Sequence, residues 1–177
     1  MSVAVFPDNT VLCNFAAVGR LGLLTGWLRG RGRWCDAVAH EARRSARVFP
    51  ALDALFSSGC LGEPIEVDDT AAGEIERLRR VALGGDPARP TQHLGEAQTC
   101  WVIREVTGFA GAWWISDDRD ALEYARGRGI QTYRTVDVMR AIVADGDLTP
   151  DQAHRVMLDM EAAGRTVWVP PSPRDLG

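Results

Sequence analysis

Short apolar runs of β-forming residues alternate with longer segments of helical periodicity, and this alternation constrains the fold more than any other feature of the chain. The runs 3–6, 64–67, 112–115 and 130–133 are too short for helices, and polar or turn-forming residues follow each one. We therefore predict a strand for each run. A parallel pair of strands needs a crossover between them, and helices separate these runs. The sequence thus predicts an α/β domain with a central, mainly parallel sheet.

The segments between these runs place apolar residues at helical spacing and begin at capping residues. Asp36 is suited to cap one helix, and Thr149 with Pro150 is suited to begin the last. The first helical segment is expected to break near 19–22, where two glycines lie. Helices are predicted over 9–24, 36–48, 50–57, 73–83, 93–107, 120–128, 136–144 and 149–164.

The length and composition set limits on the class of protein. A chain of 177 residues is long enough for one domain with its own core, which we place at residues 1–147, followed by a helical extension at 148–177. A net charge of −4 argues against a protein that coats nucleic acid through bulk charge. The sequence has no apolar stretch of membrane-spanning length and no signal-like start, so we expect a cytoplasmic protein without a membrane partner.

Acidic residues follow two of the predicted strands. Asp8 comes directly after the first run, and Asp117 and Asp118 come just after the run 112–115. Because the carboxyl ends of parallel strands meet at one edge of a sheet, these carboxylates are expected to converge there although they are distant in sequence.

Two glutamates on predicted helices can complete this group. Glu41 and Glu96 each have apolar or small residues one turn away, so neither lies on a strongly charged helix face. Several carboxylates in one cleft repel one another unless a divalent cation neutralises them. Ligands that are all oxygen atoms suit Mg²⁺ or Mn²⁺. The sequence therefore indicates a magnesium or manganese site.

Each acid taken alone also fits a structural role. A strand-end aspartate is often a helix cap or a turn residue. Glu41 alone resembles a surface residue, and Glu96 alone a favourable charge in the first turn of a helix. The joint pattern, with acids at two strand ends and on two helices, is what favours a site.

Four motifs in order resemble those of the PIN-domain family, which includes the VapC-type toxins of bacterial toxin–antitoxin pairs. Asp8-Asn9-Thr10 resembles the opening strand end, and Val38-Ala39-His40-Glu41 resembles the helix with the second acid. Leu94-Gly95-Glu96-Ala97-Gln98 is similar to an element of one branch of the family. Ile115-Ser116-Asp117-Asp118 resembles the strand-end motif with the last acid. The resemblance covers roughly residues 3–145.

This resemblance implies a PIN-like fold of three layers, α/β/α, with a central, mainly parallel sheet, and the activity of a metal-dependent endoribonuclease. Asp8, Glu96 and Asp118 would hold Mg²⁺ or Mn²⁺, with Asp117 as a further candidate ligand, and Glu41 would tune the site or position the attacking water. The catalytic acids would be Asp8, Glu41, Glu96 and Asp118, supported by hydrogen bonds from Ser116 and Asn9. Of the paired aspartates, Asp118 occupies the fixed position of the motif. A toxin of this family would also have an antitoxin partner that blocks the acid cleft.

Two further features leave alternatives open. Arg29, Arg31, Arg33 and Arg44 either contact the RNA backbone beside the acids or belong to a solvated loop and helix face. The apolar positions of the predicted helix 149–164 either close the core, pair two subunits in a homodimer, or receive an antitoxin.

Two other functions compete with a nuclease. The first is a PIN-fold binding or regulatory module without hydrolysis, because a fold does not dictate a function. The second is a phosphohydrolase of the haloacid dehalogenase type. That chemistry needs Asp-x-Asp after the first strand and a lysine, whereas this chain has Asp8-Asn9-Thr10 and contains no lysine.

Overall fold

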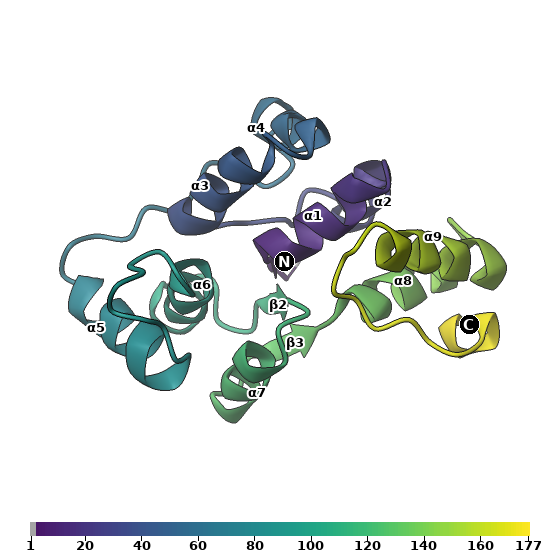
Figure 1. Ribbon diagram of the computed structural model, residues 1–177. Coiled ribbons are helices and arrows are strands. Elements are labelled where there is room, and N and C mark those ends of the chain that lie inside the picture. Colours follow the sequence, from purple (N-terminus) through teal and green to yellow (C-terminus); the bar gives the residue numbers. More distant parts are fainter. Residues whose placement is uncertain (1–2) are drawn as a thin grey trace.

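A three-stranded parallel sheet lies at the centre of the protein, in a computed structural model that describes residues 3–177 (Figure 1). Strands β1 (Val5–Pro7), β2 (Trp113–Ile115) and β3 (Gln131–Tyr133) are hydrogen-bonded in that order. The first residues of the three strands lie opposite one another, so all three strands end at the same edge. The mixed α/β class and the parallel sheet predicted from the sequence are confirmed.

Helices surround this small sheet. In the view of Figure 1, α5 and α6 lie on one side of the sheet, and α8 and α9 lie on the other. The α-helices are α1 (Asn9–Ala17), α2 (Leu21–Leu28), α3 (Asp36–Ser45), α4 (Asp53–Ser58), α5 (Ala72–Arg77), α6 (Leu94–Glu105), α7 (Arg119–Gly127), α8 (Thr135–Ala144) and α9 (Pro150–Ala162). Shorter helical turns span Pro50–Leu52, Leu78–Ala82 and Pro173–Leu176.

The prediction of a strand over 64–67 is wrong. Ile65 forms only an isolated bridge with Cys35 and does not join the sheet. Pro64 has no N–H to donate, and Asp68 accepts hydrogen bonds from the next backbone amides, which turns the chain away at once.

Two predicted helices are interrupted. The segment 9–24 contains α1 and the start of α2, separated at Gly19, whose φ of +66° is a conformation that suits glycine. The segment 73–83 is α5 followed by a π-helical turn. This turn carries Arg79 into the interior, where its guanidinium donates to Glu76 and to the carbonyl oxygens of the loop that leads to α6.

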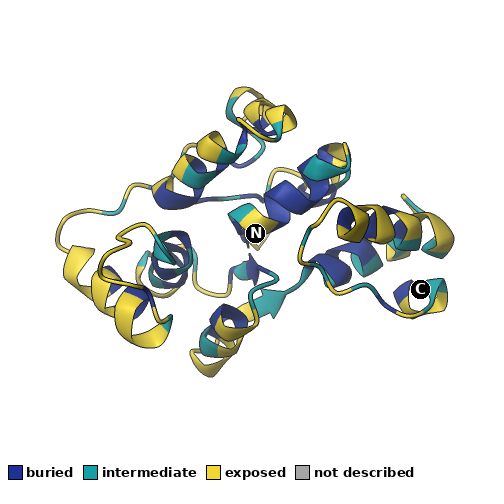
Figure 2. Cartoon of the chain, viewed as in Figure 1, coloured by how far each residue is buried: buried dark blue, intermediate teal, exposed yellow. Residues whose placement is uncertain are grey.

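Buried apolar side chains join the helices to the sheet. Phe6 and Trp114 are almost fully buried on the strands, and Phe15 and Leu24 bring α1 and α2 into the same core. Figure 2 shows buried residues on the inward faces of the helices and exposed residues on the outward faces. Helices therefore supply most of the core, around a sheet of three short strands.

The C-terminal extension packs on the rest of the chain. Met157 and Met160 of α9 and the later Leu176 are buried, and α9 contacts α8 and α1. His154 Nε2 lies 2.8 Å from the carbonyl oxygen of Pro170, which holds the last segment against α9. Among residues 3–177, no helix is long and apolar enough to cross a membrane.

Gly32 tests how tightly this core is packed. A Cβ atom there would lie 2.5 Å from Leu61 Cδ2 and 2.9 Å from the carbonyl oxygen of Cys60. Gly32→Ala is therefore expected to lower the free energy of unfolding by about 1–3 kcal/mol. Gly26→Ala is the matched control, because Gly26 lies in α2 with open space around it, and this change is expected to raise stability by about 0.5–1 kcal/mol. Urea unfolding of both variants measures the difference, and equal effects would contradict the packing described.

Candidate functional site

Four acidic residues from four parts of the chain lie near enough to one another, at the carboxyl edge of the sheet, for their charges to interact. Asp8 follows β1 and Asp118 follows β2, while Glu41 comes from α3 and Glu96 from α6. The charges of Asp8 and Glu96 both raise the pKa of Glu41, in addition to the larger effect of burial. Burial, Asp8 and Asp118 together raise the pKa of Glu96 to about 7. We call these four residues the acid cluster.

Asp8 is held in place by the start of α1. Its carboxylate caps that helix and accepts hydrogen bonds from the backbone N–H and the hydroxyl of Thr10. Its own N–H donates to the carbonyl oxygen of Ile115 at 2.8 Å, which continues the pairing of β1 with β2. The residue is 4% exposed, and this burial, more than the charge of Asp118, raises the pKa of its carboxyl group.

Gly95 lets α3 and α6 approach each other within the acid cluster. A Cβ atom at this position would lie 3.0 Å from Val38 Cγ2 and 3.1 Å from Glu41 Oε1. The absence of a side chain thus lets Glu41 lie against the first turn of α6. Burial, with the charges of Asp8 and Glu96, raises the pKa of Glu41 to about 8.

His93 is a site residue that the sequence analysis did not identify. Its Nδ1 lies 3.3 Å from Glu96 Oε2, and its backbone has a φ of +59°, uncommon for a residue other than glycine. The interaction with His93 lowers the pKa of Glu96, against the effects of burial and of the neighbouring acids. A histidine one turn before the glutamate was the only sequence signal for this contact.

The paired aspartates after β2 have different surroundings. Both carboxylate oxygens of Asp117 accept hydrogen bonds, from the backbone and hydroxyl of Thr135 and from Asn14 Nδ2 at 2.9 Å. Asp118 instead caps α7 through Ala121, and its charge acts on Asp8 and Glu96. The geometry therefore favours Asp118 over Asp117 as a ligand and gives Asp117 the role of tying β2 to α8 and α1.

Ser116 and Asn9, predicted to support the acids, both lie beside them. The hydroxyl of Ser116 is fully buried and accepts a hydrogen bond from the Asp118 N–H at 3.1 Å. Asn9 Nδ2 donates to Ser45 Oγ at 3.1 Å, which joins the start of α1 to α3.

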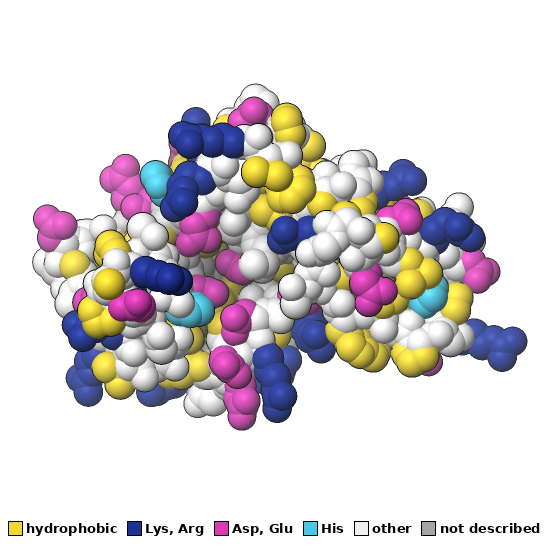
Figure 3. Space-filling model, in the orientation of Figure 1, with side chains coloured by type: hydrophobic (Ala, Val, Ile, Leu, Met, Phe, Trp, Pro, Cys, Tyr) yellow, Lys and Arg dark blue, Asp and Glu magenta, His cyan; other side chains and the backbone are white. Residues whose placement is uncertain are grey.

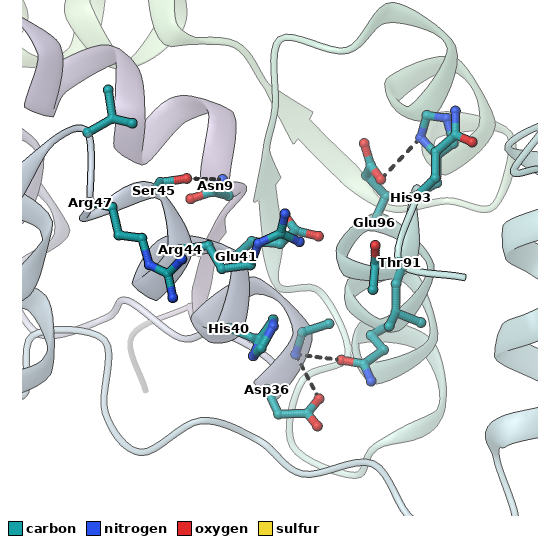
Figure 4. A pocket seen from close by; sticks show the side chains of 15 residues that line it. Asn9, Asp36, His40, Glu41, Arg44, Ser45, Arg47, Thr91, His93 and Glu96 are labelled. Carbon is teal, nitrogen blue, oxygen red and sulfur yellow. Dashed lines mark hydrogen bonds and ion pairs between the residues drawn. The ribbon is translucent and has the colours of Figure 1, made fainter. Parts of the chain in front are cut away.

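A cavity of about 980 Å³ opens beside the acid cluster. Glu41 from α3 and Glu96 from α6 line it from its two walls, as Figure 4 shows, and His93 and Asn9 also contribute. In the space-filling view of Figure 3, acidic side chains gather in a hollow near the middle of the face, and basic side chains lie at its border. Glu41 and Glu96 are therefore accessible from the surface, whereas Asp8 is buried.

The predicted arginine patch is divided between two parts of the molecule. Arg44 lines the cavity, together with His40 and Arg47. Arg31 instead packs on Trp27 and Trp113, near the amino-terminal end of the sheet, where its backbone pairs with Val5. Its two companions are also engaged there, Arg29 with Asp145 at 3.2 Å and Arg33 with carbonyl oxygens of its own loop. Only Arg44 of the four predicted arginines lies beside the acids.

The acid cluster offers the oxygen donors that Mg²⁺ or Mn²⁺ prefers. Among residues 3–177, no three His, Cys, Asp or Glu side chains are arranged closely enough to share one ion. Mg²⁺ commonly takes one or two carboxylates and completes its shell with water and substrate phosphates, so a pair of these acids suffices. Asp8 with Glu96, or Asp8 with Asp118, is the candidate pair, because the charges within each pair act on one another.

A search against protein-family models finds no matching family, and searches of curated proteins and of solved structures find no significant match.

The raised pKa of Glu41 predicts how stability depends on pH. With a pKa of about 8 in the folded protein and an ordinary value of 4.5, Glu41 binds more proton in the folded state between these limits. The free energy of unfolding should therefore fall as the pH rises from 5 to 8 in metal-free buffer. Glu41→Gln should flatten this fall, whereas Glu123→Gln, at an exposed site on α7, should keep it. Urea unfolding across this pH range is the measurement, and identical slopes in all three proteins would contradict the prediction.

Proposed function

We propose that this protein is a PIN-type endoribonuclease that depends on Mg²⁺ or Mn²⁺. The observation that carries the proposal is the acid cluster, in which the charges of acids from two strand ends and two helices act on one another and two of the acids, Glu41 and Glu96, line a surface cavity. Burying like charges together costs free energy unless a cation neutralises them. A binding site for a cation therefore explains the acid cluster better than a purely structural role does. The resemblance to PIN-domain motifs agrees with this placement.

Asp8, Glu96 and Asp118 are the candidate ligands, and a pair of them, Asp8 with Glu96 or Asp8 with Asp118, is proposed to hold the cation together with water and substrate oxygens. A divalent cation bound there would make a water molecule nucleophilic and would stabilise charge on the scissile phosphate. The cap at α1 fixes the carboxylate of Asp8, and the contact with His93 fixes that of Glu96. Glu41, on the opposite wall of the cavity, would hydrogen-bond the attacking water and orient it.

The basic side chains of α3 would bind the RNA backbone. Arg44, Arg47 and His40 line the same cavity as Glu41, so a strand held by its phosphates would pass over the acid cluster. The net charge of −4 confines this attraction to the local surface. A role as the toxin of a toxin–antitoxin pair is part of the proposal, with an antitoxin that covers the cavity.

A non-catalytic binding module is the second candidate. It is favoured by the caps that Asp8 and Asp118 form at α1 and α7, since both carboxylates already stabilise helices without a metal ion. The two functions differ in one measurable property, the hydrolysis of RNA.

Asp8→Asn should abolish cleavage. Asparagine caps a helix about as well as aspartate, so α1 is retained while a negatively charged ligand is lost. The wild-type protein is expected to cleave single-stranded RNA with Mg²⁺ or Mn²⁺ and not with EDTA, and Asp8→Asn is expected to reduce the rate at least about 100-fold. Gel analysis of the RNA products measures both effects.

Asp68→Asn is the matched control for this experiment. Asp68 accepts hydrogen bonds from the backbone and hydroxyl of Thr70, the same local arrangement that Asp8 makes with Thr10, but it lies exposed in a loop. This variant should cleave at the wild-type rate. Equal rates in wild type and Asp8→Asn with every metal would remove the catalytic proposal and favour the binding module.

A further inference from the structure

The C-terminal extension reaches the acid cluster at a second, smaller cavity. This cavity of about 280 Å³ lies between the carboxyl edge of the sheet and the segment 164–166. Its lining includes Asp118 and Thr10 from the acid side and Arg165 from the extension. A cationic residue that is distant in sequence from every motif therefore lies beside the site.

The end of α9 determines where Arg165 lies. Gly164 has a φ of +75°, and its N–H donates to the carbonyl oxygen of Glu161 at 2.9 Å. The N–H of Arg165 donates to the carbonyl oxygen of Met160 at 3.0 Å, which completes a Schellman turn. Since Met160 is fully buried, this turn is anchored in the core and sends the chain back toward α1.

The side chain of Arg165 is oriented by uncharged groups. Its Nε donates to Asn14 Oδ1 at 3.0 Å, and its guanidinium lies 5.5 Å from the centre of the Phe49 ring. Asn14 is itself held by Asp117, so the position of its oxygen is fixed. A guanidinium has five N–H donors. Within residues 3–177 its terminal nitrogens make no hydrogen bond and no ion pair, so four donors remain for another molecule.

Arg165 also lies within the electrostatic reach of the acid cluster. Burial is the main cause that raises the pKa of the Cys13 thiol. The positive charge of Arg165 lowers this pKa, and the negative charges of Asp8 and Glu41 raise it. The guanidinium borders the same cavity as Asp118 without forming an ion pair with it, so its terminal donors remain available to an anion that enters the cavity. The planar fork of arginine matches phosphate oxygens, and a polynucleotide crossing the acid cluster supplies phosphates on both sides of the cleavage point.

We propose that Arg165 binds a backbone phosphate of single-stranded RNA next to the cleavage point, so that the C-terminal extension forms part of the substrate site. This inference rests on the proposed nuclease function. Arg44 on α3 and Arg165 on the extension then contact the RNA from the two cavities that adjoin the acid cluster. The simpler view, that Arg165 only ties the extension to α1 through Asn14, makes a different prediction for salt dependence.

The test measures binding separately from cleavage. A short fluorescent polyuridylate is titrated, by anisotropy, into the full-length Asp8→Asn protein with Mg²⁺ at several salt concentrations. Adding Arg165→Gln should weaken binding about tenfold and reduce the slope of log K against log salt by about 0.7, the value for one phosphate contact on a single strand. Arg165→Lys should restore the slope, since it keeps the charge. Arg155→Gln, at an exposed site on α9, should leave both quantities unchanged.

The outcomes separate this inference from the proposed function. Weaker binding by Arg165→Gln with an unchanged salt slope would overturn the inference. That result would mean that the substitution reduces the fraction of protein able to bind RNA, while the number of phosphate contacts stays the same. Unchanged binding, or no binding of this RNA by the parent protein, would also overturn it. The wild-type protein is assayed in parallel for cleavage of the same RNA. If Arg165→Gln changes the salt slope but the wild-type protein does not cleave the RNA, the phosphate contact is supported and only the proposed hydrolysis is contradicted.

Discussion

The parallel pairing of β1 with β2 is the constraint on which the rest of the structure depends. Parallel strands carry their carboxyl ends to one edge, so Asp8 and Asp118 lie at the same edge of the sheet although more than half of the chain separates them. The Asp8 N–H that donates to Ile115 extends this pairing by one residue and aligns the acid with the strand end. Each strand has only three residues, and the helical core around the sheet holds the pairing in place.

The acid cluster concentrates unfavourable electrostatics in one place. Burial raises the pKa of Asp8, Glu41 and Glu96, and the acids reinforce one another's shifts. Helix caps, the Gly95 amide and His93 offset part of this cost. A cleft that retains several buried acids has the character of a functional site, where groups with shifted pKa values gather. The cation and substrate proposed here supply the positive charge and the ligand that such a cleft requires.

Arginines serve two distinct purposes in this lysine-free chain. Arg79 organises the loop before α6 by donating to three of its carbonyl oxygens, and Arg31 packs between aromatic rings at the opposite end of the sheet. Arg44 and Arg165 instead border the two cavities at the acid edge. The two pairs differ in their surroundings. Arg79 and Arg31 make their contacts within the protein, whereas Arg44 and Arg165 border cavities that a ligand can enter.

The sequence by itself determined the mixed α/β class, the three strands of the sheet and the positions of the acids along the chain, because periodicity, strand ends and helix caps are local properties. Local pattern could not reveal that Ile65 pairs only with Cys35, that Asp117 is bound by Thr135 and Asn14, or that the predicted arginine patch divides. It also gave no indication that Arg165 returns to α1. Those facts depend on which distant segments pack together, and only the tertiary structure decides that, because long-range packing assigns each polar group its partner.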